Sequence, residues 1–308
     1  IENISGRYFN LINLLKNKIS CNAFFGDSSN YVTFTFKGLS ENLSVKVPFE
    51  EKKDWLEKKS AINLPNDNGW INWAMIGKEN KIAFFQWNSK VSREYLQQLN
   101  RDNPKNIESS LKWIYSDALK EKRTGDVIKD IEQVPALYEQ FYLMLKEMQV
   151  RGSEYLIIDL RNNSGGMTPL TKSILYTLYG DKYINFDFDA TYSIKLSPFF
   201  LKKYGITMEQ YNNGNNTDLV TGDFNTYPFG NLQGDSYDNI VSEVAYGYKG
   251  FGGEFIKKSL ELKIQPQIIV LTSINTFSAA YHFAYFLKKL GNATIVGVAP
   301  RQAGNSFM

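Results

Sequence analysis

The chain has very few residues of the kinds that build disulfides or transition-metal centres. Its 308 residues include one cysteine, Cys21, and one histidine, His282. A single cysteine excludes an internal disulfide framework and any cysteine-rich zinc site. With only one histidine as well, a transition-metal centre would have almost no ligands. The sequence therefore predicts no metal and no other cofactor.

Long apolar runs and a strong charge imbalance are lacking too. No run approaches 18 consecutive apolar residues, so we expect no membrane-spanning segment. The 35 Lys and Arg residues nearly balance the 32 Asp and Glu residues, and a net charge of +3 does not mark a nucleic-acid binder. At 43% hydrophobic residues, the chain can bury one large core, or one core and a small domain. Nothing in the sequence indicates an oligomeric state.

The most informative segment is an apolar strand that ends in a double glycine. Residues 155–158 are apolar without alternation, which is typical of a strand buried on both faces. A mostly polar run at 159–164 ends this strand, and the double glycine 165–166 follows. Thr168 and Pro169 then supply an N-cap and a first-turn proline for a helix.

Glycines at such a turn leave backbone N–H groups open to a substrate. These groups can approach a ligand closely and stabilise developing negative charge. The same spacing also fits a tight strand-to-helix connection without any chemistry. Neither G-x-G-x-x-G nor G-K-[ST] is present, which excludes a dinucleotide fingerprint and a phosphate loop.

A second strand-to-helix unit carries a serine at its turn. Residues 267–272 predict another buried strand, and apolar spacing predicts a following helix that Gly291 closes. Residues 293–298 predict the next strand. Ser278 lies at the turn, where the helix dipole favours an alkoxide and the next amide can donate to an oxyanion. Alternatively, Ser278 is an ordinary helix N-cap.

Together, the two units resemble the serine peptidases of the carboxyl-terminal-processing and tricorn type. The resemblance rests on DLRNNSGG at 159–166 followed by TFSAA at 276–280, and it covers about residues 80–308. It implies an α/β fold with a ClpP/crotonase-like core of stacked βα units. In that superfamily the active site lies at strand-to-helix turns.

The resemblance also implies the roles of individual residues. Ser278 would be the nucleophile, and the amide of Ala279 together with that of Gly165 or Gly166 would form the oxyanion hole. The expected protein is a bacterial serine endopeptidase of peptides or unfolded proteins, secreted or in the cell envelope. Two other functions stay open: an inactive member that binds extended peptides or an apolar ligand, and a crotonase-like acyl-CoA enzyme.

A general base is not identifiable in the chain. The carboxyl-terminal-processing branch uses a lysine about two dozen residues beyond the serine, but residues 298–305 contain none, and Arg301 stays protonated. His282 lies four residues after Ser278 on the same helical face, and we favour a structural role for it. We expect the base to lie beyond the given ends of the chain. Asp159 and Arg161 are expected to orient the first turn by pairing with backbone.

The N-terminal region, residues 1–65, is predicted to be a small α+β module. A helical apolar pattern precedes two alternating strands, Tyr31–Phe36 and Leu43–Val47, which are joined through Gly38. This pattern fits either the end of a PDZ-like module or a hairpin packed on the main core. A cluster of Pro, Asn, Asp and Gly at 63–69 marks a plausible boundary.

Residues 66–308 are predicted to form the peptidase core. A strand at Lys81–Trp87 and helices at 92–99, about 108–123 and 134–149 precede the first turn. Residues 181–262 show little regular periodicity and are predicted to be a long insertion. This insertion is either a lid whose aromatic residues line a peptide groove or a hairpin on the edge of the core.

Overall fold

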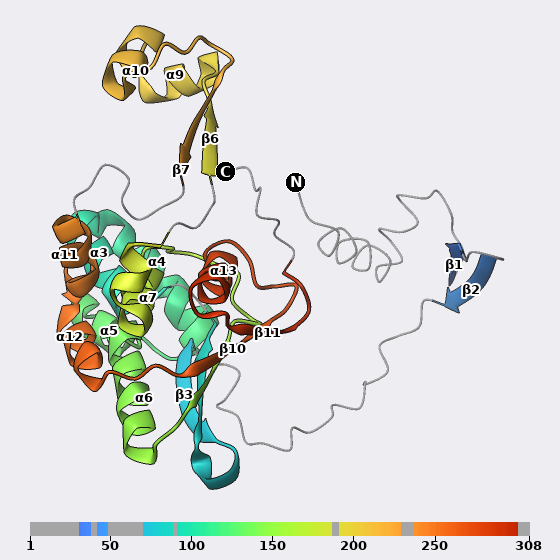
Figure 1. The fold of residues 1–308 in the computed structure, drawn as a ribbon, viewed down its shortest axis with the longest axis vertical. Helices are drawn as coiled ribbons and strands as arrows, with labels where there is room; N and C mark the ends of the chain where they lie inside the picture. Colours follow the sequence, from blue (N-terminus) through green and yellow to red (C-terminus); the bar gives the residue numbers. More distant parts are fainter. Residues whose placement is uncertain are drawn as a thin grey trace.

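A five-stranded, mostly parallel sheet forms the centre of the core (Figure 1). The computed structural model describes residues 31–37, 42–48, 70–88, 91–186, 191–228 and 237–300. The strand order is β11-β10-β5-β4-β3, with β3 antiparallel to β4 and every other pair parallel. The strands are β3 (Ile71–Ile76), β4 (Ile82–Trp87), β5 (Tyr155–Asp159), β10 (Gln267–Thr272) and β11 (Thr294–Gly297). The expected α/β class with a mainly parallel sheet is confirmed.

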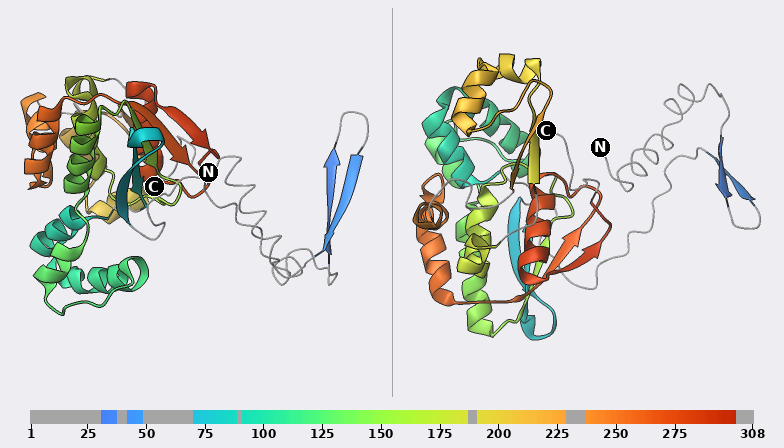
Figure 2. Two further views of the ribbon diagram at one scale, coloured as in Figure 1. Left: turned by 90° about the horizontal axis from the view of Figure 1, so that it is seen from below. Right: turned by 45° about the horizontal axis from the view of Figure 1, so that its top comes forward.

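The helices pack in layers against this sheet. In the core they are α3 (Arg93–Asp102), α4 (Ile107–Trp113), α5 (Val127–Gln133), α6 (Leu137–Arg151), α7 (Leu170–Tyr179), α8 (Asp181–Ile184), α11 (Tyr237–Ala245), α12 (Gly253–Leu262) and α13 (Ala279–Gly291). Helix α6 contacts β3 and β4, α13 contacts β10 and β11, and α7 contacts α13. Helices α11 and α12 form an outer layer beyond α6 and α7 (Figures 1 and 2). None of the helices in the described part is long and apolar enough to cross a bilayer.

Aromatic side chains join the sheet to both neighbouring helices. Trp87 of β4 meets Phe283 of α13 edge to face, with ring centroids 5.4 Å apart. Phe85 meets Phe141 of α6 in the same geometry at 5.4 Å. All four rings are almost completely buried. Since burying one such ring contributes about 2 kcal/mol, these contacts fix the helices on the sheet.

Several element boundaries differ from those predicted. The predicted helix at 108–123 is α4 followed by a π-helical segment, Ile114–Leu119, and it ends where Lys120 adopts a left-handed conformation. Helix α7 begins at Leu170 after Pro169, without a capping bond from Thr168. Strand β3 and helix α5 were not predicted, because each is short and its apolar residues give no clear period.

Gly291 was predicted to cap α13, and this prediction is wrong. It is the last helical residue, and Asn292 takes the left-handed cap position with φ of 52°. Asparagine tolerates this conformation better than most residues, because its short polar side chain bonds locally. A side chain at 291 would collide with the hydroxyl of Tyr179. The glycine therefore serves packing between α13 and α7.

Residues 181–262 contain far more regular structure than expected. Besides α8, α11 and α12, the segment holds β6 (Thr191–Lys195), α9 (Pro198–Tyr204), α10 (Met208–Asn215), β7 (Phe224–Pro228), β8 (Gly247–Tyr248) and β9 (Phe251–Gly252). Residues 191–228 form a projecting module, in which β6 pairs with β7 and two helices close the far end (Figures 1 and 2). Helices α11 and α12 instead pack on α7 and α6 and belong to the core.

In the N-terminal region the structure describes two strands. Strands β1 (Tyr31–Lys37) and β2 (Asn42–Pro48) pair antiparallel, so both predicted strands are confirmed. The predicted helical pattern and the boundary at 63–69 lie outside the described residues. A PDZ-like or hairpin module at 1–65 stays a prediction.

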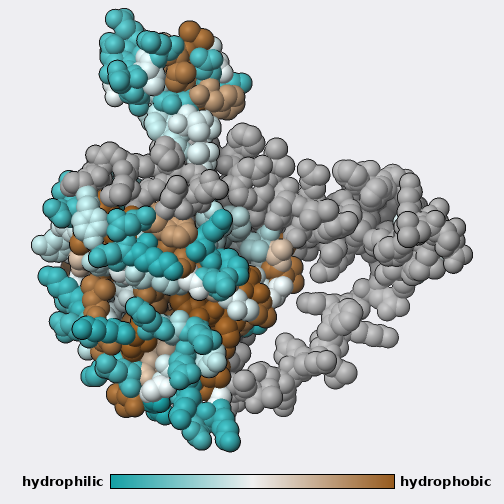
Figure 3. Space-filling view, viewed as in Figure 1, coloured by the Kyte–Doolittle hydropathy of each residue, from teal (hydrophilic) through white to brown (hydrophobic). Residues whose placement is uncertain are grey.

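The edge strand β11 is open to solvent. All four of its residues are exposed, and the apolar side chains of Ile295, Val296 and Val298 are among the exposed large hydrophobic residues. Figure 3 shows apolar side chains gathered on the side of the core where β10 and β11 lie.

Candidate active site

The turn before α13 holds Ser278 in a strained backbone conformation. Its φ is 52° and its ψ is −125°, although it has a side chain that disfavours positive φ. Such a conformation costs on the order of 1–3 kcal/mol and is concentrated at functional sites. The hydroxyl makes no capping hydrogen bond to the helix amides, so Ser278 is not an ordinary N-cap. In α/β-hydrolases, a sharp, strained strand-to-helix turn presents the nucleophilic serine.

The double-glycine bend after β5 packs directly against this serine turn. A Cβ atom added to Gly165 would lie 2.6 Å from Ser278 Cβ and 2.8 Å from the carbonyl oxygen of Phe277. The same Cβ would lie 3.2 Å from the amide nitrogen of Ala279. Gly165 also has φ of 104°. Only glycine fits here, both because of its conformation and because the two turns touch.

Hydrogen bonds join the two turns beyond the ends of their strands. The Leu160 amide donates to Leu271 O at 3.0 Å, which extends the pairing of β5 with β10. Thr276 Oγ1 donates to Leu160 O at 2.8 Å, and Ser273 Oγ donates to Arg161 O. Adjacent parallel strands bring their carboxyl ends to one edge, and these bonds hold the following loops in register.

Asn163 connects three strand ends at once. Its side chain is fully buried, its Nδ2 donates to Trp87 O at 2.6 Å, and its Oδ1 accepts from the Gly165 amide at 2.9 Å. Its own carbonyl accepts from the Phe277 amide at 3.1 Å. The sequence predictions missed this residue. An asparagine two residues before a glycine was the available signal, because its side chain can bond the amide two positions on.

Asp159 and Arg161 orient the first turn, as predicted. The buried carboxylate of Asp159 accepts from the Arg161 amide at 3.0 Å and from its guanidinium at 2.9 and 2.7 Å. The pair therefore satisfies a buried charge within the turn itself. The Asp159 carboxylate thus bonds both the backbone and the side chain of Arg161, which fits the predicted structural role.

Helix α13 carries Ala279 and His282, two further residues discussed in the sequence analysis. Ala279 is its first residue and is fully buried. The first amides of a helix have no intrahelical acceptor and lie at the positive end of the dipole. His282 is half-buried one turn later, with its amide donating to Ser278 O at 3.0 Å and its ring beside Tyr281.

No cluster of three or more metal-ligating side chains occurs in the part of the chain that the structure describes. A surface hollow of about 340 Å³ lies between α3, α5 and β9. Its walls come from Gln97, Asn100, Arg101, Ile128, Ile131, Glu132 and Phe251. None of these residues belongs to the two turns, so the hollow is not part of the site.

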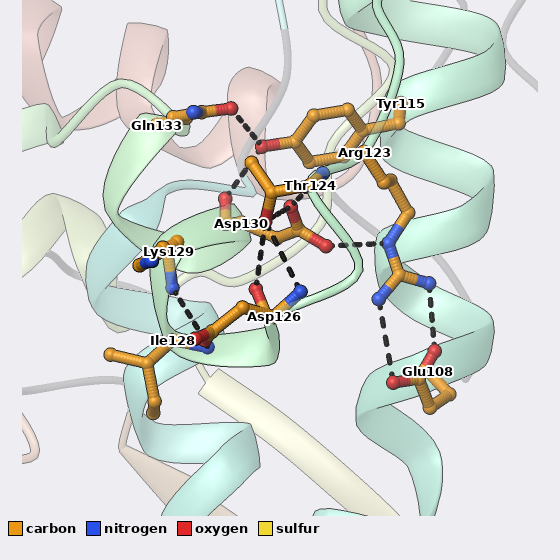
Figure 4. Close-up of polar contacts among 9 residues, drawn as sticks. All are labelled: Glu108, Tyr115, Arg123, Thr124, Asp126, Ile128, Lys129, Asp130 and Gln133. Carbon is orange, nitrogen blue, oxygen red and sulfur yellow. Dashed lines mark hydrogen bonds and ion pairs between the residues drawn. The ribbon is translucent and has the colours of Figure 1, made fainter.

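A second polar network, around Arg123, is structural (Figure 4). The buried carboxylate of Asp130 accepts from Arg123 Nε at 2.7 Å and from the amide and hydroxyl of Thr124, both at 2.7 Å. Arg123 also binds Glu108. Burial acts to raise the pKa of Asp130, but the bonds from Arg123 and Thr124 lower it below its usual value. The buried carboxylate of Asp130 therefore has its partners within this network, which joins α4 and α5 through the connection that carries Arg123 and Thr124.

Comparison with known proteins identifies a family. The model of peptidase family S41 matches residues 128–306, more than half of the chain and both turns. This match confirms the resemblance drawn from residues 159–166 and 276–280. No curated protein matches the chain.

Two solved structures are similar at low identity. One is a candidate peptidase from Parabacteroides merdae, with 11% identity, a TM-score of 0.31, and coverage of 77% of this chain and 44% of that one. The other is a candidate S41 protease from Bacteroides fragilis, with 11% identity, a TM-score of 0.30, and coverage of 86% and 45%. The chain therefore spans less than half the length of each structure.

Proposed function

Because the chain belongs to peptidase family S41, we propose that it is a serine endopeptidase with Ser278 as its nucleophile. The observation that carries this proposal is the contact of the Gly165 bend with the Ser278 turn. This contact supports a single pocket in which the Ser278 hydroxyl and backbone amides of both turns face the same substrate carbonyl. We further propose that the βα units β5–α7 and β10–α13 stack as in the ClpP/crotonase fold.

In the proposed reaction, Ser278 Oγ attacks the carbonyl carbon of a peptide bond. The carbonyl oxygen becomes an oxyanion, which accepts hydrogen bonds from the amides of Ala279 and Gly166. We assign the second donor to Gly166 because the Gly165 amide already donates to Asn163 Oδ1. Each such donor stabilises the transition state by about 3 kcal/mol. The tetrahedral intermediate then expels the amine, which takes up the proton that the general base removed from Ser278 Oγ, and leaves an acyl-enzyme that water hydrolyses.

The general base is not assigned to α13. Its two lysines, Lys288 and Lys289, lie in the last turn, about 15 Å along the helix axis from Ser278 at 1.5 Å per residue. Lys288 also binds Asn292 Oδ1 at 2.7 Å. His282 shares the helix of the nucleophile, and we keep it as a structural residue. The proposal therefore takes the base from another segment.

Labelling with a fluorophosphonate tests the nucleophile. The probe reacts with activated serines, so wild-type protein should be labelled, and peptide mapping should find the label on Ser278. Ser278→Ala should remove it. Ser164→Ala is the matched control, because Ser164 is an exposed serine in the neighbouring bend, and it should leave labelling intact.

Two results would contradict the proposal. Label that persists in Ser278→Ala would place the reactive serine elsewhere. A folded wild-type protein that resists the probe, yet binds an extended peptide, would favour an inactive family member that only binds peptides.

A further inference from the structure

We propose that Asn163 is a positioning residue that sets which amide of the double-glycine bend faces the substrate. The inference rests on the proposed peptidase function and deepens it. Asn163 does not touch the substrate in this proposal. It acts through the Gly165 amide and through the serine turn.

Every polar group of Asn163 is used, and its partners come from both turns and a third strand. Its amide donates to Leu160 O at 3.0 Å, and its carbonyl accepts from the Phe277 amide at 3.1 Å. Its side chain adds the bonds to Trp87 O and from the Gly165 amide. Trp87 ends β4, Phe277 precedes the nucleophile, and Gly165 begins the bend. One buried side chain therefore relates the bend to the serine turn and to the neighbouring strand.

The bend needs such a constraint, because two successive glycines have little conformational preference. Gly165 and Gly166 have φ of 104° and 128°, and glycine loses more backbone freedom on folding than any other residue. The Asn163 bond holds the Gly165 amide toward the interior. It thereby fixes the peptide planes that follow, including the one that carries the Gly166 amide. An oxyanion hole is effective only when its donors are oriented before the reaction.

A packing role alone would not require this arrangement. Thr276 and Ser273 already join the two turns through Leu160 and Arg161. The bond from Gly165 to Asn163 Oδ1 adds no further contact between the turns. What it specifies is the direction of one amide in the bend. Loss of Asn163 should therefore lower reactivity by more than it lowers stability.

The test compares Asn163→Ala with a matched control in the same domain. Ser173 is also buried, but it lies in α7, and its Oγ donates to Val244 O of α11 at 2.8 Å rather than to either turn. Ser173→Ala should lower the unfolding midpoint but leave the fluorophosphonate labelling rate of folded protein unchanged. Asn163→Ala should lower that rate about 100-fold, the effect of losing one oxyanion donor.

The labelling rate of Asn163→Asp should depend on pH in a way that a purely structural role of Asn163 would not predict. A protonated aspartic acid can still donate to Trp87 O and accept from the Gly165 amide, whereas a carboxylate would repel the Trp87 carbonyl. The labelling deficit of Asn163→Asp relative to wild type should therefore shrink as the pH falls. The deficit of Asn163→Ala should stay constant with pH.

Deuterium exchange separates this inference from the proposed function. Exchange at residues 164–167 should be faster in Asn163→Ala than in Ser173→Ala at equal global stability. If Asn163→Ala labels at the wild-type rate, or exchange is equal in the two variants, the positioning role is wrong. If wild-type protein does not label at all, the proposed function fails, and exchange still decides whether Asn163 orders the bend.

Discussion

The two turns of the proposed active site and the projecting module are built in opposite ways. In the turns, the side-chain hydrogen bonds that join different strands span 76 to 116 residues of sequence. In the module, residues 191–228, the side-chain hydrogen bond between Ser193 and Thr226 spans 33 residues, and the pairing of β6 with β7 spans no more than the module itself. The site is therefore a product of the assembled core, whereas the module is held together by nearby residues.

The bonds within the module show this local construction. Tyr211 and Tyr227 share a hydroxyl–hydroxyl bond of 2.6 Å, and Asn225 donates to both hydroxyls. Thr207 and Gln210 form a capping box at the start of α10. The surface carries large exposed side chains such as Phe199, which is 77% exposed.

This difference predicts how far the effect of a substitution should extend through the structure. A change at the contact of the two turns should displace Ser278, the proposed nucleophile, because the two turns touch directly. A change of the same chemistry in the module should stay there. Paired substitutions in the two regions test the contrast directly.

The largest effect is expected from Gly165→Ala. Its new Cβ would overlap Ser278 and the carbonyl of Phe277, so the turns must separate, and labelling should fall at least about 100-fold. The matched control is Gly222→Ala in the module, where φ is 107° but no atom lies within 4 Å of the added Cβ. That variant should cost about 1 kcal/mol in backbone strain and leave the labelling rate unchanged. Equal losses in both variants would refute the contrast.

The next largest effect is expected for stability, from Arg123→Ala. It leaves the buried Asp130 carboxylate without its ion pair, which should cost about 3 kcal/mol in the free energy of unfolding. Arg151→Ala removes an exposed i,i+4 pair with Glu147 and should cost no more than about 0.5 kcal/mol. Urea denaturation measures both values. A loss below 1 kcal/mol for Arg123→Ala would show that Thr124 alone satisfies Asp130.

A smaller, pH-dependent effect is expected from Glu94. This carboxyl is buried in α3 and accepts from the Leu137 and Tyr138 amides at the start of α6, both at 3.0 Å. Burial raises its pKa above the ordinary 4.5, despite opposing hydrogen bonds. The folded state therefore binds the proton more tightly than the unfolded state.

Stability from this group should be fully present below pH 4.5 and lost as the pH rises through the raised pKa. Denaturation midpoints of wild type and Glu94→Gln, measured over that range, check the sign. Relative to Glu94→Gln, wild type should lose stability as the pH rises. A parallel pH dependence of the two proteins would show that Glu94 binds its proton equally tightly in the folded and unfolded states.

The smallest effect is expected from Tyr227→Phe in the module. It removes the hydroxyl that bonds Tyr211 and Asn225, which should cost about 1 kcal/mol locally. Deuterium exchange should rise within 191–228 and stay unchanged at the active-site turns. Faster exchange at 273–280 would show that the module and the site are coupled.

Part of the site could be predicted from sequence. The uninterrupted apolar runs before both turns identify buried parallel strands, and the turn residues Gly165, Gly166 and Ser278 follow from where those runs end. The order of the two motifs was enough to indicate the family. By contrast, the helices of 191–262 were missed, because short elements with mixed polar and aromatic residues show no clear period.

The sequence was thus sufficient for the strands that precede the two turns, for the turns and for Ser278, because each depends on neighbours within a few positions. The contact of Gly165 with the serine turn and the bonds that join Asn163 to Trp87 and to Phe277 depend on residues 76 or more positions apart. Those features arise only when β4, β5 and β10 pair in register. The physical reason is that the bond from the Gly165 amide to Asn163 is local, but the groups that hold Asn163 in place, Trp87 O and the Phe277 amide, come from β4 and from the turn that follows β10.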